Sequence, residues 1–108
     1  AGGLVGHWAG EAIDVAGVAL VPTYFFAGGQ LQRVEYLAQQ GGPQPFSALL
    51  QWGRDAWGQE LATAGPEGHY ASWSVDGLDA YLQLPAGGEA QRARLVVRQQ
   101  VLKDAGEL

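Results

Sequence analysis

The chain of 108 residues contains no cysteine, and this absence excludes several kinds of chemistry. Without thiols there is no disulfide, no thiolate nucleophile and no cysteine-ligated metal or iron–sulfur site. Methionine is also absent, position 1 included, so we expect the chain to begin after a cleaved signal, a removed tag or a domain cut. The sequence does not distinguish between a cytoplasmic location and a periplasmic or secreted one.

Basic residues are scarce, because six Lys and Arg stand against eleven Asp and Glu and the net charge is −5. Such a chain is repelled by phosphate backbones and anionic lipid surfaces, which argues against a nucleic-acid partner and against polybasic membrane binding. The longest apolar run, Val15 to Ala27, is interrupted by Gly17 and Pro22 and is too short to span a bilayer. No membrane span is predicted.

Apolar residues and glycine, in contrast, are abundant. Apolar residues make up 47% of the chain, and the seventeen glycines are spread along it, several of them as pairs. This composition excludes disorder as the main state, and the length favours a single domain over residues 1–108. Glycine pairs between apolar segments indicate turns that separate short strands.

Two turn signals predict β-hairpins. Gly28-Gly29 and Asp76-Gly77 each supply two residues suited to positive φ between alternating segments. Pro22 indicates an edge or a bulge within its strand, because proline cannot donate to a ladder. Outside the ambiguous middle of the chain, we expect strands over 4–13, 18–27, 30–39, 69–75, 78–84 and 92–102.

The segment from Phe46 to Gly65 fits two structures. Phe46, Leu49 and Trp57 fall at helical spacing, which allows one short helix over 47–62. Two interior glycines argue against a helix, so two strands are favoured and the helix is kept as the alternative. The two favoured strands cover 46–52 and 57–63.

Seven or eight short strands at intervals of about ten residues are typical of an antiparallel sandwich or an up-and-down barrel. Closure removes the edges that an open sheet of this length would expose, so we predict an all-β protein with an antiparallel up-and-down β-barrel. In a barrel of about eight strands the interior is filled with side chains or holds one small ligand.

A Gly6-x-Trp8 motif on the first strand, followed by "YFFAGGQL" (Tyr24 to Leu31) and "GHYASWSVDGLDAYLQL" (Gly68 to Leu84), resembles the calycin superfamily of lipocalins and fatty-acid-binding proteins. The resemblance implies a lipocalin-like barrel, an indole that lies across one barrel end and an apolar ligand inside. Avidin-like calycins bind biotin through a set that includes asparagine, and this chain has no asparagine.

No catalytic, metal or cofactor site is predicted. His7 and His69 are the two histidines, and neither has an Asp or Glu at ligand spacing. Ser47, Ser72 and Ser74 lack a Gly-x-Ser-x-Gly setting, so capping or strand-face positions explain them. The carboxylates are scattered and mostly fall in or near turns, which leaves no pair placed for acid–base chemistry.

Large aromatic side chains with polar tips are the usual lining of an apolar pocket. An inward arginine would pair with a carboxylate head group, as in the fatty-acid binders that the pattern resembles. The predicted ligand-binding residues are the aromatic walls Trp8, Tyr24, Phe26, Tyr36 and Trp73 and an anchor at Arg94 or Arg98.

The favoured function is non-covalent binding of a small apolar or amphipathic molecule inside the barrel, with Trp8 as its closure. The alternative is a protein-binding or inhibitory module whose core is filled and whose loops contact a partner. An enzyme on a calycin scaffold is the least favoured hypothesis. The protein is expected to be a monomer or a homodimer.

Overall fold

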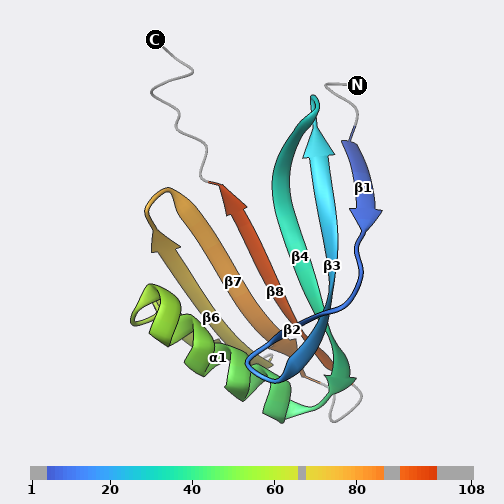
Figure 1. Ribbon diagram of the computed structural model, residues 1–108. Helices are drawn as coiled ribbons and strands as arrows, with labels where there is room; N and C mark the ends of the chain where they lie inside the picture. The colour runs from blue at the N-terminus through green and yellow to red at the C-terminus, as the bar shows by residue number, and fades with distance from the viewer. Residues whose placement is uncertain (1–4, 66–67, 87–90, 100–108) are drawn as a thin grey trace.

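The protein is mostly antiparallel β-sheet with one helix, as the computed structural model shows for residues 5–65, 68–86 and 91–99, the part of the chain that the structure describes (Figure 1). Its elements are β1 (Val5–Ala9), β2 (Ile13–Val15), β3 (Val18–Ala27), β4 (Gln30–Gly41), α1 (Pro43–Trp57), β5 (Ala62–Gly65), β6 (Gly68–Val75), β7 (Leu78–Pro85) and β8 (Arg92–Gln99). The predicted all-β class with one short helix is confirmed. Residues 100–102 of the last predicted strand lie outside the described residues.

Both predicted hairpin turns form. Ala27 pairs with Gln30 around Gly28 and Gly29, whose φ angles are 61° and 79°. Asp76 and Gly77 have φ angles of 52° and 80°. Two consecutive positive φ angles define the turn whose twist matches that of the flanking strands. These two local signals therefore place the β3–β4 and β6–β7 hairpins.

The strand expected over 4–13 is interrupted, and Pro22 lies opposite the interruption. β1 pairs with β3 up to Thr23, and β2 resumes pairing at Leu20. Between them the Gly10 amide donates a 2.8 Å hydrogen bond to the Pro22 carbonyl. The N–H and C=O of a residue in an antiparallel ladder point to the same side, so the missing donor of Pro22 faces this irregular stretch. The prediction of an edge or bulge at Pro22 fits this position.

The prediction of two strands over 46–52 and 57–63 is wrong, because α1 occupies most of this segment. Pro43 and Pro45 lie in the first turn, where a missing N–H costs the helix nothing. The helix begins after Gly42, so Ser47 does not cap it. It ends at Gly58, whose φ of 91° stops the helical path and whose amide bonds to the Arg54 carbonyl at 2.9 Å.

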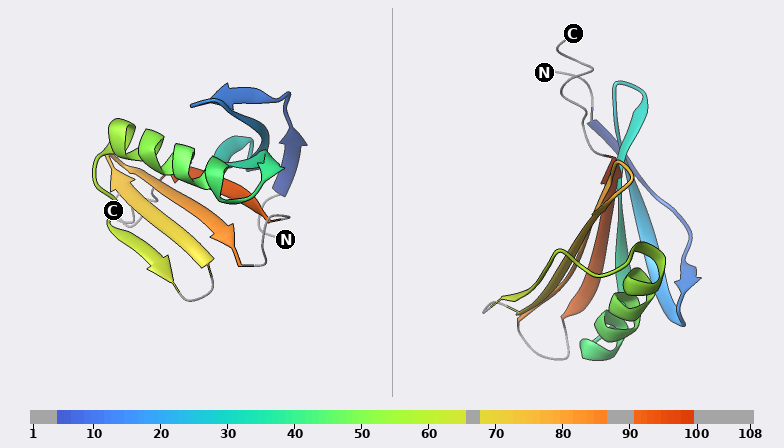
Figure 2. Two further views of the ribbon diagram at one scale, coloured as in Figure 1. Left: turned by 90° about the horizontal axis from the view of Figure 1, so that it is seen from below. Right: turned by 90° about the vertical axis from the view of Figure 1, so that its left-hand side faces the viewer.

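The helix also decides the strand order, which is β1-β3-β4-β8-β7-β6-β5, with β2 beside β3. The chain leaves β4 in the middle of the sheet, crosses its face as α1 and reaches the far edge at β5, from which β6, β7 and β8 return to β4. Within the described residues, eight strands form an open sheet whose two edges are β1 and β5, so the predicted closure into a barrel is not found there. The sheet instead bends around the helix (Figure 2).

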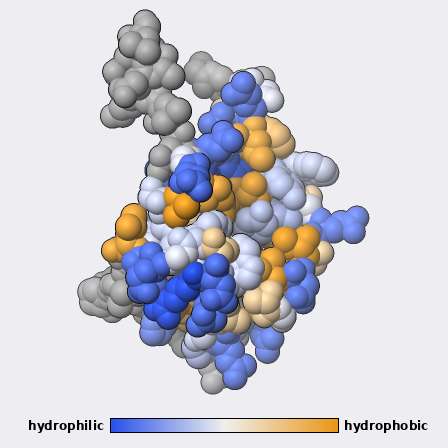
Figure 3. All heavy atoms as spheres, turned by 60° about the vertical axis from the view of Figure 1, so that its left-hand side comes forward, coloured by the Kyte–Doolittle hydropathy of each residue, from blue (hydrophilic) through white to orange (hydrophobic). Residues whose placement is uncertain are grey.

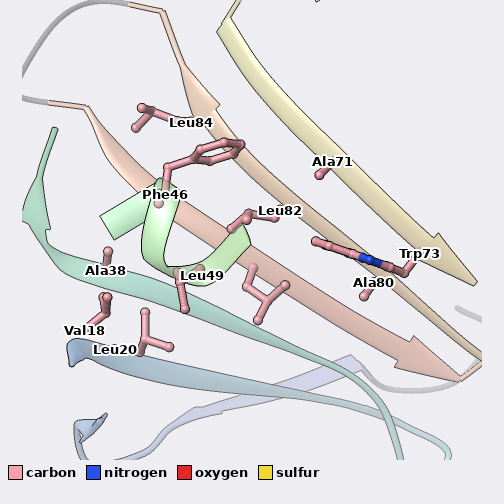
Figure 4. Close-up of a cluster of buried hydrophobic side chains, with 12 residues drawn as sticks. Val18, Leu20, Ala38, Phe46, Leu49, Ala71, Trp73, Ala80, Leu82 and Leu84 are labelled. Carbon is pink, nitrogen blue, oxygen red and sulfur yellow. The ribbon is translucent and has the colours of Figure 1, made fainter. Parts of the chain in front are cut away.

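The core lies between α1 and the concave face of this sheet. Phe46 and Leu49 of the helix point toward the strands and meet apolar side chains from both halves of the sheet (Figure 4). Leu20, Leu49 and Leu82 are fully buried. Small residues at Ala38, Ala71, Ala80 and Ala93 let the helix approach the strands closely. Apolar burial of this kind is the main stabilising term of the fold.

Candidate functional site

The helix covers one half of the concave face and leaves the other half open. Five large side chains lie on this second half, and we call them the open patch: Trp8, Tyr24, Phe26, Leu31 and Tyr36. In the space-filling view, hydrophobic residues gather between the helix and the tip of the β3–β4 hairpin (Figure 3). Contiguous exposed apolar patches are a common feature of interaction surfaces, which makes the open patch the candidate site.

Strand register brings the open patch together. Trp8 stands directly opposite Tyr24, with ring centroids 5.6 Å apart, and Phe26 stands opposite Leu31. Trp8 is 65% exposed and Leu31 is 44% exposed, whereas Tyr24, Phe26 and Tyr36 are half-buried. Four of the five residues, Leu31 excepted, were predicted as ligand-binding from the sequence. The structure therefore places these four on one surface.

Leu31 joins the patch through a β-bulge, a feature that the sequence does not reveal. Phe25 pairs with Arg33, but the register shifts by one residue before Phe26, which then pairs with Leu31. With regular pairing Phe26 would meet Gln32, and Leu31 would point to the opposite face. One extra residue in a strand reverses the side on which every later side chain lies. Simple alternation therefore missed Leu31.

Two phenol groups form the inner end of the open patch. Tyr36 packs against the core, and its burial raises the pKa of its hydroxyl, with a further increase from the neighbouring Tyr24. Within the described part of the chain, neither hydroxyl makes a hydrogen bond to another protein group. Both hydroxyls can therefore donate to or accept from a bound molecule.

Trp8 does not close a barrel end. It lies on the edge strand β1 of an open sheet and is largely exposed, so the architectural role expected for it is not found. The side chain of His7 lies outside those that the structure describes.

Trp73 is not part of the open patch, contrary to its predicted role as a wall. It is 2% exposed beneath α1, and its indole N–H donates a 2.7 Å hydrogen bond to the Gly58 carbonyl. Its ring lies 5.5 Å from that of Trp57, centroid to centroid. Trp73 therefore holds the end of the helix against the sheet and presents no surface to a ligand.

The predicted arginine anchors are also misplaced, because Arg94 and Arg98 lie on the convex face. Their neighbours Ala93 and Leu95 point into the core, so the two arginines point the other way. Their guanidinium groups lie 3.8 Å from carboxylate oxygens of Glu35 and Asp79, respectively. Neither can reach a molecule bound on the concave face.

The strongest ion pair of the described residues was not predicted. Arg54 donates two hydrogen bonds to the Glu60 carboxylate, from Nε at 2.8 Å and from Nη2 at 2.6 Å, and Gln59 adds a third at 3.2 Å. The Glu60 side chain is 2% exposed, and the bonds from Arg54 lower its pKa to about 2. This pair joins the last turn of α1 to the chain that follows, which is a structural role.

No cluster of three or more His, Asp or Glu side chains suited to a metal ion occurs among the described residues. Within the same ranges, no helix has the length and apolar character needed to cross a membrane. Comparison with protein-family models, with curated proteins and with solved structures finds no match. The resemblance to calycins therefore stays a prediction, and a function must be argued from the open patch itself.

Proposed function

We propose that the protein binds a small apolar or amphipathic molecule, without chemical conversion, on the open patch. The observation that carries this proposal is the exposure of Trp8 and Leu31 beside half-buried aromatic rings on one face of the sheet. Removing apolar surface of this kind from water stabilises a complex by roughly 25 cal/mol per Å². The binding site is a concave surface at the side of α1, in place of the barrel interior that the sequence predicts.

The phenol groups give the proposed ligand its orientation. The apolar body lies along Phe26, Leu31 and Trp8, and a polar end lies near the hydroxyls of Tyr24 and Tyr36. A hydrogen bond from the ligand to such a hydroxyl replaces a bond to water and breaks no bond within the protein, so it adds to specificity at little cost. The ligand class is therefore an apolar molecule with one uncharged or weakly acidic polar group.

The test is a fluorescence titration with the neutral, environment-sensitive probe N-phenyl-1-naphthylamine, followed by displacement with medium-chain alcohols and fatty acids. Leu31→Asn is expected to weaken probe binding about tenfold, since a polar group replaces apolar contact area. Leu61→Asn is the matched control, because Leu61 is 72% exposed and lies outside the open patch. It is expected to bind as the wild type does.

Equal binding by the two variants would contradict the proposal, as would a lack of probe binding by the wild-type protein. Circular dichroism of both variants checks that the fold is kept. Leu31 is well suited to this test because it is 44% exposed and contributes little to the core.

A second candidate function, binding to a protein partner, is supported by the open edge of the patch. Trp8 lies on β1, and β1 pairs on one side with β3 and forms an edge of the sheet. An edge strand with an exposed tryptophan suits the addition of a strand from another chain. In that case the wild-type protein does not bind the probe with measurable affinity. It does capture one defined protein partner, and Trp8→Ser abolishes this capture.

A further inference from the structure

The convex face carries an excess of positive charge although the chain as a whole is acidic. Four of the five arginines lie there on two neighbouring strands: Arg33 on β4, and Arg92, Arg94 and Arg98 on β8. Arg33 and Arg98 stand directly opposite each other, an arrangement of like charges that destabilises a sheet unless counter-charges compensate it. Glu35 and Asp79 compensate this pair, since Arg33 lies 3.0 Å from Glu35 and Arg98 lies 3.8 Å from Asp79.

Arg92 and Arg94 are less well compensated, and they share a depression. The depression has a volume of about 300 Å³ and is lined by Leu37, Gln83, Pro85, Gln91, Arg92 and Arg94. Glu35 lies 3.8 Å from Arg94 but is held more closely by Arg33. Arg92 forms no ion pair with any residue that the structure describes. None of the described residues that line the depression carries a carboxylate.

We propose that this depression binds a small oxyanion, a phosphate or carboxylate group, between the guanidinium groups of Arg92 and Arg94. The two arginines are two residues apart on β8, so they lie on the same face. Gln83 stands directly opposite Arg94 in the register, and its carboxamide and that of Gln91 supply further N–H donors. Planar guanidinium groups match the two oxygens of a carboxylate or phosphate.

This site is independent of the open patch, because the two lie on opposite faces of the sheet. The concave face offers apolar area and phenol hydroxyls, whereas the convex depression offers four donor side chains. A molecule that carries the oxyanion would therefore bind without displacing an apolar ligand. The same separation allows each site to be tested in a variant that keeps the other.

The test is calorimetry at low ionic strength with inorganic phosphate in one arm and succinate in the other. Arg92→Gln and Arg94→Gln are each expected to weaken binding about tenfold, the usual effect of losing one charge-assisted contact. Arg98→Gln is the matched control, because it removes the same charge from the same strand and face outside the depression. It is expected to change binding less than about twofold, as charges in solvent are screened.

The arm that gives the tighter binding identifies the oxyanion as phosphate or carboxylate. The proposal is overturned if neither anion binds at about 10 mM, far above the dissociation constants of specific sites, or if Arg98→Gln weakens binding as much as the other two substitutions. Changes in the amide chemical shifts of the wild-type protein on addition of the anion test the site without a variant. Phosphate or succinate is expected to shift Gln83, Arg92 and Arg94, and a shift spread evenly over the surface contradicts the site.

Discussion

Gly53 of α1 lies directly against the indole ring of Trp73. A Cβ atom added at position 53 would lie 2.7 Å from both Cζ2 and Cη2 of that ring. Atoms at this separation clash, so the helix approaches the sheet this closely only because residue 53 has no side chain. The glycine that argued against a helix in the sequence is thus the residue that lets the helix pack.

Gly53→Ala is expected to destabilise the protein by about 1 to 2 kcal/mol. Overpacking a filled core costs roughly 1 to 3 kcal/mol, and the better helix propensity of alanine returns up to about 1 kcal/mol. Urea unfolding measures the difference. In a Trp73→Phe background the smaller ring relieves the clash, so the same substitution is expected to be neutral or stabilising. An equal loss in both backgrounds would show that the ring contact is not the cause.

Ala16→Gly is expected to stabilise the protein by about 0.5 to 1 kcal/mol, because Ala16 has a φ of 55° in the turn before Gly17. A left-handed backbone is strained for alanine and relaxed for glycine. Ala56→Gly in the exposed last turn of α1 is the control, and it is expected to cost up to about 1 kcal/mol. Thermal unfolding of the two variants should thus give shifts of opposite sign, and shifts of the same sign would contradict the strained turn.

The Arg54–Glu60 pair is expected to stabilise the fold down to acidic pH. The folded-state pKa of Glu60 is about 2, below its ordinary value of 4.5. A lowered pKa means that the unfolded chain binds the proton first, so the contribution is complete above pH 4.5 and is lost as the pH falls through 2. The melting temperatures of wild type and Glu60→Gln are expected to differ at neutral pH and to converge near pH 2.

A carboxyl titration followed by NMR checks the same pair directly. The midpoint for Glu60 is expected near 2 in the wild-type protein. Arg54→Gln removes the main cause of the shift, so the midpoint is expected to move upward, toward the ordinary range. An unchanged midpoint in that variant would assign the low pKa to another group.

Tyr36 is expected to ionise above the ordinary pKa of 10, as followed by its absorbance near 295 nm in alkaline solution. Burial disfavours the phenolate, and the charge of Tyr24 adds to this effect. A raised pKa means that stability is lost as the pH rises above 10. Tyr24→Phe removes the effect of the Tyr24 charge, the smaller of the two causes, so the Tyr36 pKa is expected to fall slightly. An increase instead would contradict the proximity of the two hydroxyls.

The paired substitutions Tyr24→Phe and Tyr36→Phe also test how the open patch orients a ligand. Removing both hydroxyls is expected to weaken binding of an alcohol by roughly three- to tenfold, the value of one hydrogen bond. Binding of N-phenyl-1-naphthylamine, which relies on apolar contact, is expected to stay within about twofold. An equal loss for both molecules would show that the tyrosines act through shape alone.

Part of the candidate site was readable from the alternation of residues. Tyr24 and Phe26 share a face because residues two apart in a strand lie on the same side. Strand pairing then brings Trp8, opposite Tyr24, and Tyr36, opposite Pro22, to that face. The same rule places Arg94 and Arg98 opposite Ala93 and Leu95, so their convex position was visible in the sequence although an inward anchor was predicted. Leu31 was hidden, since a bulge changes the alternation and is set by the pairing of two strands.

The sequence by itself determined the hairpins, because Gly28-Gly29 and Asp76-Gly77 carry their positive φ preference wherever they occur. Tertiary structure decided the middle of the chain. Gly53 and Gly58 oppose a helix locally, but both have a role in the folded protein. Gly53 gives room to the Trp73 ring, and Gly58 ends the helix and accepts a hydrogen bond from the Trp73 indole N–H. Burial against a sheet outweighs a local propensity of about 1 kcal/mol per glycine, and the helix then fills half of the concave face and leaves the open patch beside it.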